Sequence, residues 1–434
     1  MSSGPITIYD KSALQALSVD QAALFGQFYR IVITPLFFVE TLADLEKEVD
    51  EGKTPEAVVG LIAAKTANQT ADANAHHSRL IVAELLGHRI TMDGRPHVVG
   101  GRHVMTKEGR RGIVYDDAPE AKALDRWQKQ RFLEIEREIA KHWRESLQEL
   151  KIRKLDVNAM FAEVPRPRSL EDVRDYAAGF ARQADGPSFL AALNTLQVPA
   201  GPRGTIFQRW LEHGSPSLGA FAPYAAHVLT VQVFFELAVS LGLISGDRPS
   251  NAADMAYLFY LPFCMIFTSA DKLHMKTAPL FLRRDQVFLS GADLKADLKR
   301  LDEYFSAQPK EVLDRGVMFF EPPYNGDFIT SKLWKQCLPG WRSREGQAKK
   351  KPMDPEREKK LLEQFKAETE SPEVAPIDSD SADFVVIQRA YPVRMGNGKL
   401  SPRISPSARG STSARSARTK QGHKLRTEKK MAAR

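Results

Sequence analysis

The stretch SNAADMAYLFYLPFCMIFTSADKLHMK, at residues 250–276, combines two short elements with two acidic residues. Asp254 stands at the start of an apolar run that predicts a helix, and residues 264–268 have the composition of a short buried strand. Asp271 follows just beyond the end of that strand. Open α/β sheets bind their ligands at the carboxyl ends of strands, so this stretch predicts an α/β fold with a site at that position.

The same arrangement occurs twice near the N-terminus of the chain. Residues 6–9 form an apolar strand candidate, and Asp10 comes directly after it. Residues 30–34 form another, and the helix predicted over residues 36–45 carries Glu40 in its first turns. Four carboxylates, including the two aspartates above, therefore lie at or just beyond the ends of short apolar strands. This recurrence is the main functional signal in the sequence.

Carboxylates gathered in one cleft indicate a metal-dependent nuclease. Two Mg²⁺ or Mn²⁺ ions about 3.5–4 Å apart can activate a water and neutralise the charge on a phosphate under attack. Such hard ions take oxygen ligands, whereas carboxylates without a cation repel one another. Taken singly, Asp10 and Glu40 are also explained as a helix cap and a surface acid, and that alternative stays open. As a set, the four acids predict a metal site.

Three segments resemble the PIN domain family. IYDKSALQAL (8–17) is similar to its opening strand, where an aspartate ends the strand and a small hydroxyl residue follows. TPLFFVETLADL (34–45) resembles the second segment, with a glutamate inside a helix. NAADMAYLFYLPFCMIFTSADKLH (251–274) resembles the third, where an aspartate opens a helix and a second aspartate follows the next strand. About 200 residues between the second and third segments lie outside the resemblance.

The resemblance implies a ribonuclease that depends on Mg²⁺ or Mn²⁺, and bacterial PIN proteins often act as toxins or in defence. The acids that match the family by position, and would bind metal and catalyse, are Asp10, Glu40, Asp254 and Asp271. The matching polar neighbours of the site, which would contact the substrate, are Ser12, Thr268 and Ser269.

Basic side chains after the last acid are candidates for contacts with substrate. Lys272 and His274 follow Asp271 at alternating positions, which would let both reach a phosphate beside the cleft. A solvated loop explains the same residues equally well. We therefore expect substrate contacts from these two residues but keep the simpler interpretation open.

The predicted architecture is a PIN-like α/β core with a large helical insertion and a disordered basic tail. The core is a small parallel sheet with flanking helices. The predicted boundaries are 1–52 for the first part of the core, 53–245 for the insertion, 246–341 for the second part of the core and 342–434 for the tail. From residue 389 onward there are 13 Lys or Arg residues and one acid, so residues 1–388 carry a net charge of about −4. The basic tail could add salt-sensitive affinity for RNA.

Two local predictions concern the insertion. The segment ITMDGRPHVV (90–99) has an Asp-Gly pair typical of a hairpin turn, and residues 103–117 repeat this style. Residues 119–150 carry apolar side chains at helical intervals among mixed charges, which predicts one long amphipathic helix.

Cysteine use and apolar patterning indicate a cytoplasmic protein. Cys264 and Cys337 lie 73 residues apart and fit neither a disulfide framework nor a zinc pattern. The N-terminal residues show no basic region followed by an apolar core, so no signal peptide is expected. The longest apolar stretches, 220–244 and 256–268, are interrupted by proline and polar residues, which predicts buried elements and no membrane association.

Several alternatives stay open at this point. His76, His77 and Glu84 form a competing constellation that could bind a transition metal or contact substrate. A PIN-like chain could also lack catalysis and serve as a module that binds RNA or a protein, and a protein partner or inhibitor is possible for an active enzyme too. A third alternative is a nuclease that selects DNA by its structure, so both RNA and DNA are candidate partners.

Overall fold

The computed structural model describes most of the chain up to residue 338 and short pieces beyond it. The described residues are 4–46, 53–66, 72–98, 101–105, 111–115, 119–149, 155–163, 165–248, 250–314, 321–324, 326–338, 341, 356, 375–376, 392–394 and 400–402. Residues Met1–Gln388 group into one compact unit and Arg389–Arg434 into a second. In the second unit β9 (Pro392–Arg394) pairs antiparallel with β10 (Leu400–Pro402). Most of the tail that we predict to be disordered lies outside the described residues.

A five-stranded parallel sheet is the centre of the first unit, which confirms the predicted α/β class. Its strands lie in the order β3-β2-β1-β6-β7, and every neighbouring pair is parallel. The strands are β1 (Ile6–Tyr9), β2 (Arg30–Ile33), β3 (Asp72–Ala73), β6 (Ile266–Ser269) and β7 (Val287–Ser290). All residues of β1, β2 and β6 are buried, as expected for parallel strands covered on both faces. The sheet is therefore built from two separate parts of the chain, residues 6–73 and residues 266–290.

The register joins the first strand of the chain to a strand more than 250 residues later. Thr7 lies opposite Ile266, and Tyr9 lies opposite Thr268. The ladder continues one step past β1, because the Asp10 amide donates to the Thr268 carbonyl oxygen over 3.1 Å. This pairing brings the ends of β1 and β6 together.

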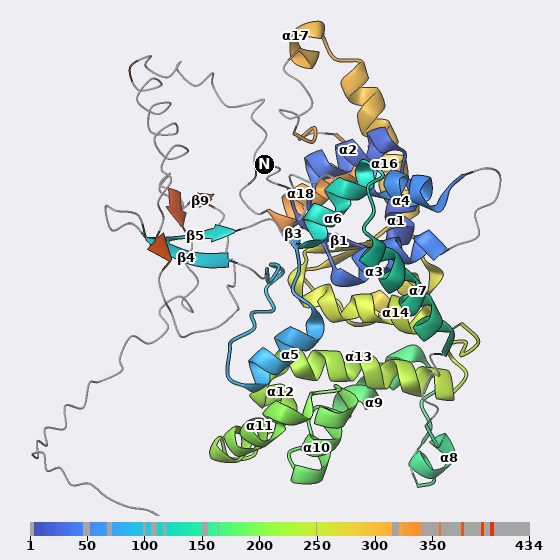
Figure 1. Cartoon of the computed structure of the whole chain (residues 1–434), viewed down its shortest axis with the longest axis vertical. Helices are drawn as coiled ribbons and strands as arrows, with labels where there is room; N and C mark the ends of the chain where they lie inside the picture. The colour runs from blue at the N-terminus through green and yellow to red at the C-terminus, as the bar shows by residue number, and fades with distance from the viewer. Residues whose placement is uncertain are drawn as a thin grey trace, which may run out of the picture. The chain divides into compact units, whose positions relative to one another are not determined.

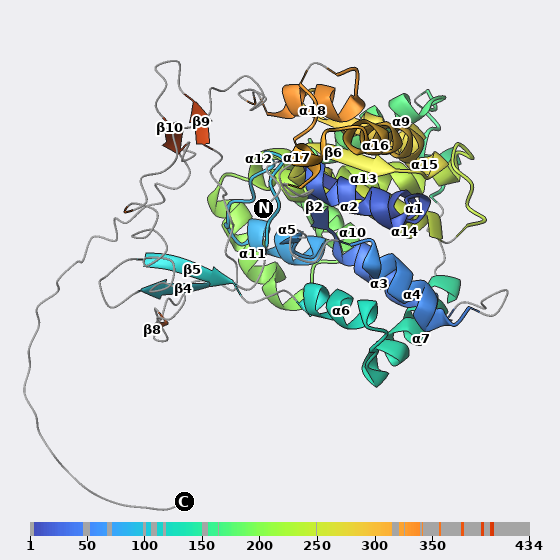
Figure 2. The same ribbon diagram turned by 90° about the horizontal axis from the view of Figure 1, so that it is seen from above.

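Several helices close to the sheet begin at residues that cap them. The helices of this group are α1 (Lys11–Ala16), α2 (Val19–Phe28), α3 (Pro35–Ala43), α16 (Gly291–Ser306) and α18 (Ile329–Cys337). Asp10, Ser18 and Thr34 cap the first three, and Pro35 occupies the first turn of α3. In Figure 2 α1, α2 and α16 lie next to one another, and α16 contacts both of the others. The Trp334 indole donates to the Phe28 carbonyl oxygen over 2.7 Å, which fixes α18 against the end of α2.

The segment predicted as an insertion is mainly helical. It contains α4 (Pro55–Ala64), α5 (His77–Leu85), α6 (Pro119–Gln128), α7 (Glu134–Glu149), α8 (Val157–Met160), α9 (Leu170–Phe180), α10 (Gly186–Thr195), α11 (Ala200–Glu212), α12 (Leu218–Phe221) and α13 (Pro223–Ser240). Helix α13 is mostly buried, and Figure 1 shows α9 to α12 beside it. The same segment also supplies β3, which extends the sheet beside β2. The segment predicted as an insertion therefore contributes a strand to the core sheet.

The remaining elements of the first unit are short. They are η1 (Asp44–Glu46), β4 (Gly101–Met105), β5 (Arg111–Tyr115), α14 (Ser250–Ala256), η2 (Tyr257–Phe263), α15 (Lys272–Thr277), η3 (Ala278–Leu280), α17 (Lys310–Leu313) and β8 (Ala375–Pro376). Helix α14 begins at Ser250, so Asp254 lies in its second turn and does not open a helix as predicted. A 3₁₀ helix that contains Pro262 then leads to β6, which begins at Ile266. No helix among the described residues is long and apolar enough to cross a membrane.

The hairpin predicted over residues 90–99 is wrong, whereas the β4–β5 hairpin is confirmed. Gly94 does turn the chain, with φ of +82°, but its amide donates to the Pro262 carbonyl oxygen over 2.9 Å. A Cβ at this position would lie 3.2 Å from the Cys264 carbonyl oxygen, so glycine suits the close approach. The His97 amide likewise bonds to Asn74 Oδ1. The Gly94 and His97 amides thus bond to other parts of the chain, and described residues 90–98 form no strand.

The long helix predicted over residues 119–150 is two helices, α6 and α7. The break includes Gln130, which has φ of +54°. Glu136, in the first turn of α7, accepts hydrogen bonds from the Trp127 indole over 3.0 Å and from the Leu133 amide over 2.9 Å. The buried Glu136 carboxylate therefore holds the end of one helix to the start of the next.

Candidate functional site

The four predicted acids come from four segments that meet at one edge of the sheet. Asp10 follows β1, Glu40 lies on α3 beyond β2, and Asp271 follows β6. Because these strands are parallel neighbours, their carboxyl ends share an edge. The strand order changes direction between β1 and β6, and open α/β sheets bind ligands in the crevice at such a point. Asp254 joins them from α14, and the Asp254 carbonyl oxygen is 2.6 Å from Nε2 of His274 on α15.

Asp10 is the buried centre of this edge, with only 4 % of its surface exposed. The Ala13 amide donates to Oδ1 over 2.9 Å, and the Ser269 hydroxyl donates to Oδ2 over 2.6 Å. Ser12 Oγ lies 2.8 Å from both carboxylate oxygens, and His274 Nδ1 lies 3.1 Å from Oδ2. Four protein groups thus occupy the acceptor positions of this carboxylate.

His274 is fully buried and connects Asp10 to Asp254. One ring nitrogen faces the Asp10 carboxylate and the other faces the Asp254 carbonyl oxygen, so both nitrogens donate when the ring is protonated. Burial opposes that charge, but the hydrogen bond and charge of Asp10 hold the pKa of His274 above its ordinary value. Burial would likewise raise the pKa of Asp10, but the His274 hydrogen bond and charge hold it below the ordinary value. When His274 is protonated, the two side chains form a buried ion pair.

Glu40 is a partly exposed acid whose protonated form is favoured. Burial raises its pKa to about 7, and the negative charges of Asp254 and Asp10 act in the same direction. The Tyr257 hydroxyl, which donates to Oε2 over 2.6 Å, opposes the shift, as does the charge of Lys11. Glu40 is therefore close enough to Asp254 and Asp10 for their charges to raise its pKa.

The pKa of Asp254 also depends on the charges of neighbouring acids. Burial raises its pKa to about 6, and the charges of Asp271 and Asp10 add to the shift. His274 and Arg248 act against it. The carboxylates thus converge closely enough to perturb one another, and perturbed acids at a sheet edge are typical of functional sites.

The predicted substrate-binding residues have different surroundings. Ser12 bonds to Asp10 and also accepts from the Ala270 amide over 3.0 Å. Ser269 lies between Asp10 and His274. Thr268 is buried, and its hydroxyl has no hydrogen-bond partner among the described residues. Side chains alternate along a strand, so Thr268 points to the face of β6 opposite Ser269.

The two basic candidates after Asp271 differ in exposure. Asp271 caps α15 by accepting from the Leu273 amide, and Lys272 is exposed in the first turn of that helix. Residues 272–277 therefore form a helix and not an extended segment, and this helix turns the His274 side chain inward to Asp10. Only Lys272 is exposed to contact a substrate in this arrangement.

Tyr257 and Lys11 belong to the site but were not predicted. Tyr257 stands in an apolar run and looked like a core residue, although its hydroxyl bonds to Glu40. Lys11 follows Asp10 directly, and its ammonium lies 3.1 Å from both the Glu40 carbonyl oxygen and Asp44 Oδ1. Adjacency to Asp10 was the one signal in the sequence that could have identified Lys11. No pattern in the sequence marked Tyr257.

The competing constellation does not come together. Glu84 accepts from the Tyr224 and Ala225 amides at the start of α13 and acts there as a buried cap. The rings of His76 and His77 lie against each other with centroids 4.2 Å apart. In the described part of the chain, no group of three or more His, Cys, Asp or Glu side chains is arranged to hold a metal ion.

Comparisons of the chain with protein-family models, with curated proteins and with solved structures gave no match.

Proposed function

We propose that the acidic edge between β1 and β6 is the active site of a PIN-like, metal-dependent nuclease that hydrolyses RNA phosphodiester bonds. The observation that carries this proposal is the convergence of acids from separate segments on one edge of the sheet. The charges of Asp254 and Asp10 raise the pKa of Glu40, and the charges of Asp271 and Asp10 raise the pKa of Asp254. Keeping such acids together is unfavourable unless a cation or another positive group is bound. A hydrolase that uses divalent cations gives these residues a common purpose.

The donor chemistry of the edge fits Mg²⁺ or Mn²⁺, which prefer oxygen ligands. Glu40, Asp254 and Asp271 are partly exposed, and each keeps at least one carboxylate oxygen that no described residue bonds. These three residues would hold the cation. When bound, it supplies positive charge to the phosphodiester and acidity to a water molecule.

Other residues of the chain would position these acids and neutralise the charge of the substrate. Asp10 has its oxygens occupied by protein donors, so its part is to fix His274 and through it α14. The Tyr257 hydroxyl orients Glu40. Lys272 is exposed beside Asp271 and would pair with a substrate phosphate. We assign no substrate contact to buried His274.

A module that binds RNA or a protein without cutting is the second candidate. Two observations favour it: Asp10 is occupied by protein donors, and no three acids among the described residues are already arranged around one point. In the nuclease, the three partly exposed side chains would have to rotate toward one another on binding the cation. The two candidates therefore differ in whether metal binds at this edge.

The deciding experiment is cleavage of labelled single-stranded RNA and matched DNA by wild type and Asp254→Asn, with Mn²⁺ or Mg²⁺ and with EDTA. Asp20→Asn changes an exposed acid on α2 and is the matched control. The proposal expects cutting that needs metal, that Asp254→Asn abolishes and that Asp20→Asn retains. Preferential cutting of DNA would move the proposal to a DNA nuclease. RNA binding with no cutting of either polymer would favour the binding module.

A further inference from the structure

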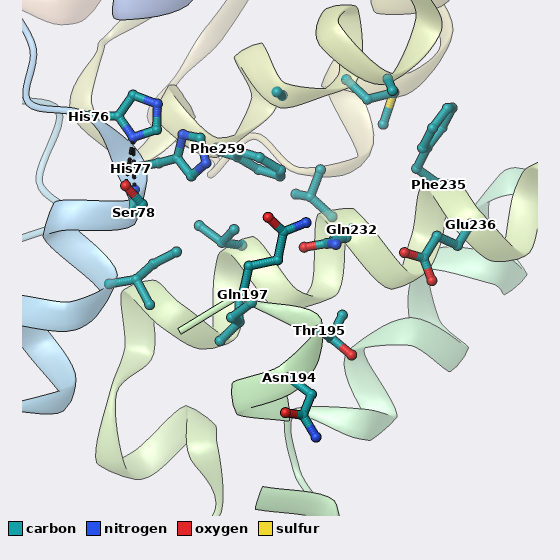
Figure 3. Close-up of a pocket in the computed structure, with 17 residues that line it drawn as sticks. His76, His77, Ser78, Asn194, Thr195, Gln197, Gln232, Phe235, Glu236 and Phe259 are labelled. Carbon is teal, nitrogen blue, oxygen red and sulfur yellow. Dashed lines mark hydrogen bonds between the residues drawn. The ribbon is translucent and has the colours of Figure 1, made fainter. Parts of the chain in front are cut away.

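A pocket of about 610 Å³ lies between α5, α10, α13 and the α14–η2 segment (Figure 3), and none of the four acids of the sheet edge lines it. Ligand pockets commonly measure about 300–1,000 Å³, so this one could hold a nucleoside-sized group. Its wall carries a group of rings, His76, His77 and Phe259, and its lining also includes the amides of Gln197 and Gln232. Met255 is part of its apolar lining. The pocket thus combines rings with groups that donate and accept hydrogen bonds.

The rings form a continuous group of tilted contacts, with interplanar angles of 31° between His76 and His77 and 57° between His77 and Phe259. The centroids of His76 and His77 are 4.2 Å apart, and those of His77 and Phe259 are 5.0 Å apart. The His77 amide donates to the Tyr260 hydroxyl over 3.1 Å, which fixes the start of α5 against η2. Burial lowers the pKa of His76 and that of His77, the latter to about 3. Both imidazoles are therefore neutral near pH 7 and suited to stacking.

Two amide side chains lie opposite this group of rings. Figure 3 shows the Gln197 side chain extending toward Gln232. Neither amide bonds to another of the described residues. Gln197 has φ of +53° because it follows the C-cap of α10, where its own backbone amide bonds to the Asn194 carbonyl oxygen and the Val198 amide bonds to the Leu193 carbonyl oxygen. The two side-chain amides are thus available to form hydrogen bonds with the edge of a planar ligand.

The charge of the lining excludes a phosphate as the main ligand group. None of the described residues that line the pocket is a lysine or an arginine, and one of them, Glu236, is acidic. An anion would find no charged partner there. A neutral ring with donors and acceptors on its edge fits better, and nucleobases are recognised by stacking on aromatic rings and by hydrogen bonds to their edges.

The pocket and the acidic edge share one helical segment. Met255 and Phe259 face the pocket from α14 and η2. Asp254 and Tyr257 belong to the opposite side of the same segment, where Tyr257 bonds to Glu40. A ligand in the pocket would therefore contact the segment that positions Asp254.

We propose that the pocket binds one nucleobase of the single-stranded nucleic acid whose backbone lies at the acidic edge. This inference rests on the proposed function, because it assigns the strand to that edge. Stacking on His77 and Phe259 would hold the base, and Gln197 and Gln232 would select its edge. Phosphates would stay outside, near exposed Lys272.

The test measures binding in EDTA, so that no cleavage is needed. A short labelled single-stranded RNA is titrated with wild type, Gln197→Gly and Phe259→Leu, and the affinity is read by fluorescence anisotropy. Gln197→Gly removes the amide, while glycine adopts positive φ without strain, so the fold is retained. Exposed Gln208→Leu and His142→Ala are the matched controls.

Phe259→Leu should weaken RNA binding about 5- to 150-fold, which corresponds to the loss of one stacked base. Gln197→Gly should weaken it about 2- to 10-fold, and the controls should bind as wild type does. Wild-type affinity in both pocket variants would overturn the proposal. Free nucleoside monophosphates that bind as tightly as the RNA would also overturn it, since the pocket would then serve a free nucleotide.

The cleavage assay separates this proposal from the proposed function. If wild type never cuts but the pocket variants lose RNA binding, the pocket stands and the nuclease fails. If wild type cuts with metal and the variants bind and cut as well as it does, the nuclease stands and the pocket fails.

Discussion

The Ser269 hydroxyl donates to Oδ2 of Asp10 over 2.6 Å, across 259 positions of sequence. This contact follows from the pairing of β1 with β6, which sets the two strand ends side by side. His274 Nδ1 lies 2.8 Å from Ser269 Oγ and 3.1 Å from the same Asp10 oxygen. Serine, histidine and aspartate therefore form one buried network at the switch in strand order. That network fixes the edge on which the proposed function depends.

His274→Ala should destabilise the protein strongly. The substitution leaves the Asp10 charge buried without its cation, and breaking one partner of a buried pair costs about 3–5 kcal/mol. The measurement is urea unfolding at pH 7, with exposed His213→Ala as the control. The double variant Asp10→Asn/His274→Ala should recover part of the loss, because no charge is then stranded. Equal stability of His274→Ala and His213→Ala would contradict the ion pair.

The ion pair of Asp10 and His274 should stabilise the protein only within a defined pH range. The pKa of His274 is raised, so its contribution to stability is lost as the pH rises through its folded value. The pKa of Asp10 is lowered, so its contribution is lost as the pH falls through its own folded value. Between these limits both groups are charged, and the difference between wild type and His274→Ala should be largest there.

Glu40 and Asp254 should make the metal-free protein less stable as the pH rises. Their pKa values are raised to about 7 and about 6, so the folded state favours their protonated forms. The resulting stability is present at low pH and is lost as the pH rises through those values. The free energy of unfolding should fall by roughly 1–3 kcal/mol between about pH 5 and pH 8, allowing for partial exposure.

Variants test the assignment of this slope. Glu40→Gln and Asp254→Asn should each flatten the pH dependence, since neither new side chain titrates. Asp20→Asn, on an exposed acid, should leave it unchanged. The assignment fails if all three variants keep the wild-type slope in unfolding curves measured in EDTA.

If the acidic edge binds metal, Mn²⁺ should make the free energy of unfolding rise with pH where it falls in the metal-free protein. A ligand that binds only the folded state adds about 2.7 kcal/mol at a concentration one hundred times its Kd. Because the acids must ionise to bind a cation, the gain should be larger at about pH 8 than at about pH 5. Thermal unfolding with and without Mn²⁺ measures it. Asp254→Asn should lose most of the gain, and an equal gain in this variant would place the metal elsewhere.

Much of the sheet could be predicted from short apolar runs followed by polar caps. Residues 6–9 are the predicted strand without change, and Asp10 lies where its sequence position indicated. The spacing of residues in the sequence could not predict where the His274 side chain points. The alternation of Lys272 and His274 suggested two residues on one side of an extended segment, but capping by Asp271 starts a helix that turns the imidazole inward.

Tertiary contacts explain the other differences. The Asp-Gly turn at Gly94 is real, but its amide bonds to Pro262 and so no hairpin forms. The break between α6 and α7 depends on the buried contact of Glu136 with Trp127, which a pattern of charges and apolar residues does not reveal. The Tyr257–Glu40 contact likewise joins segments 217 positions apart. Local sequence predicts which segments exist, whereas these contacts between segments decide how they end.

Glu84 should matter for stability and not for metal. Its side chain is only 5 % exposed and accepts from the Tyr224 amide over 3.1 Å and the Ala225 amide over 2.9 Å at the start of α13. Glu84→Ala leaves two buried donors unpaired and should cost about 2–4 kcal/mol in urea unfolding. Glu84→Gln keeps one acceptor oxygen and should cost less. Both variants should keep the wild-type response to Mn²⁺, and a lost response would instead revive a metal site with His76 and His77.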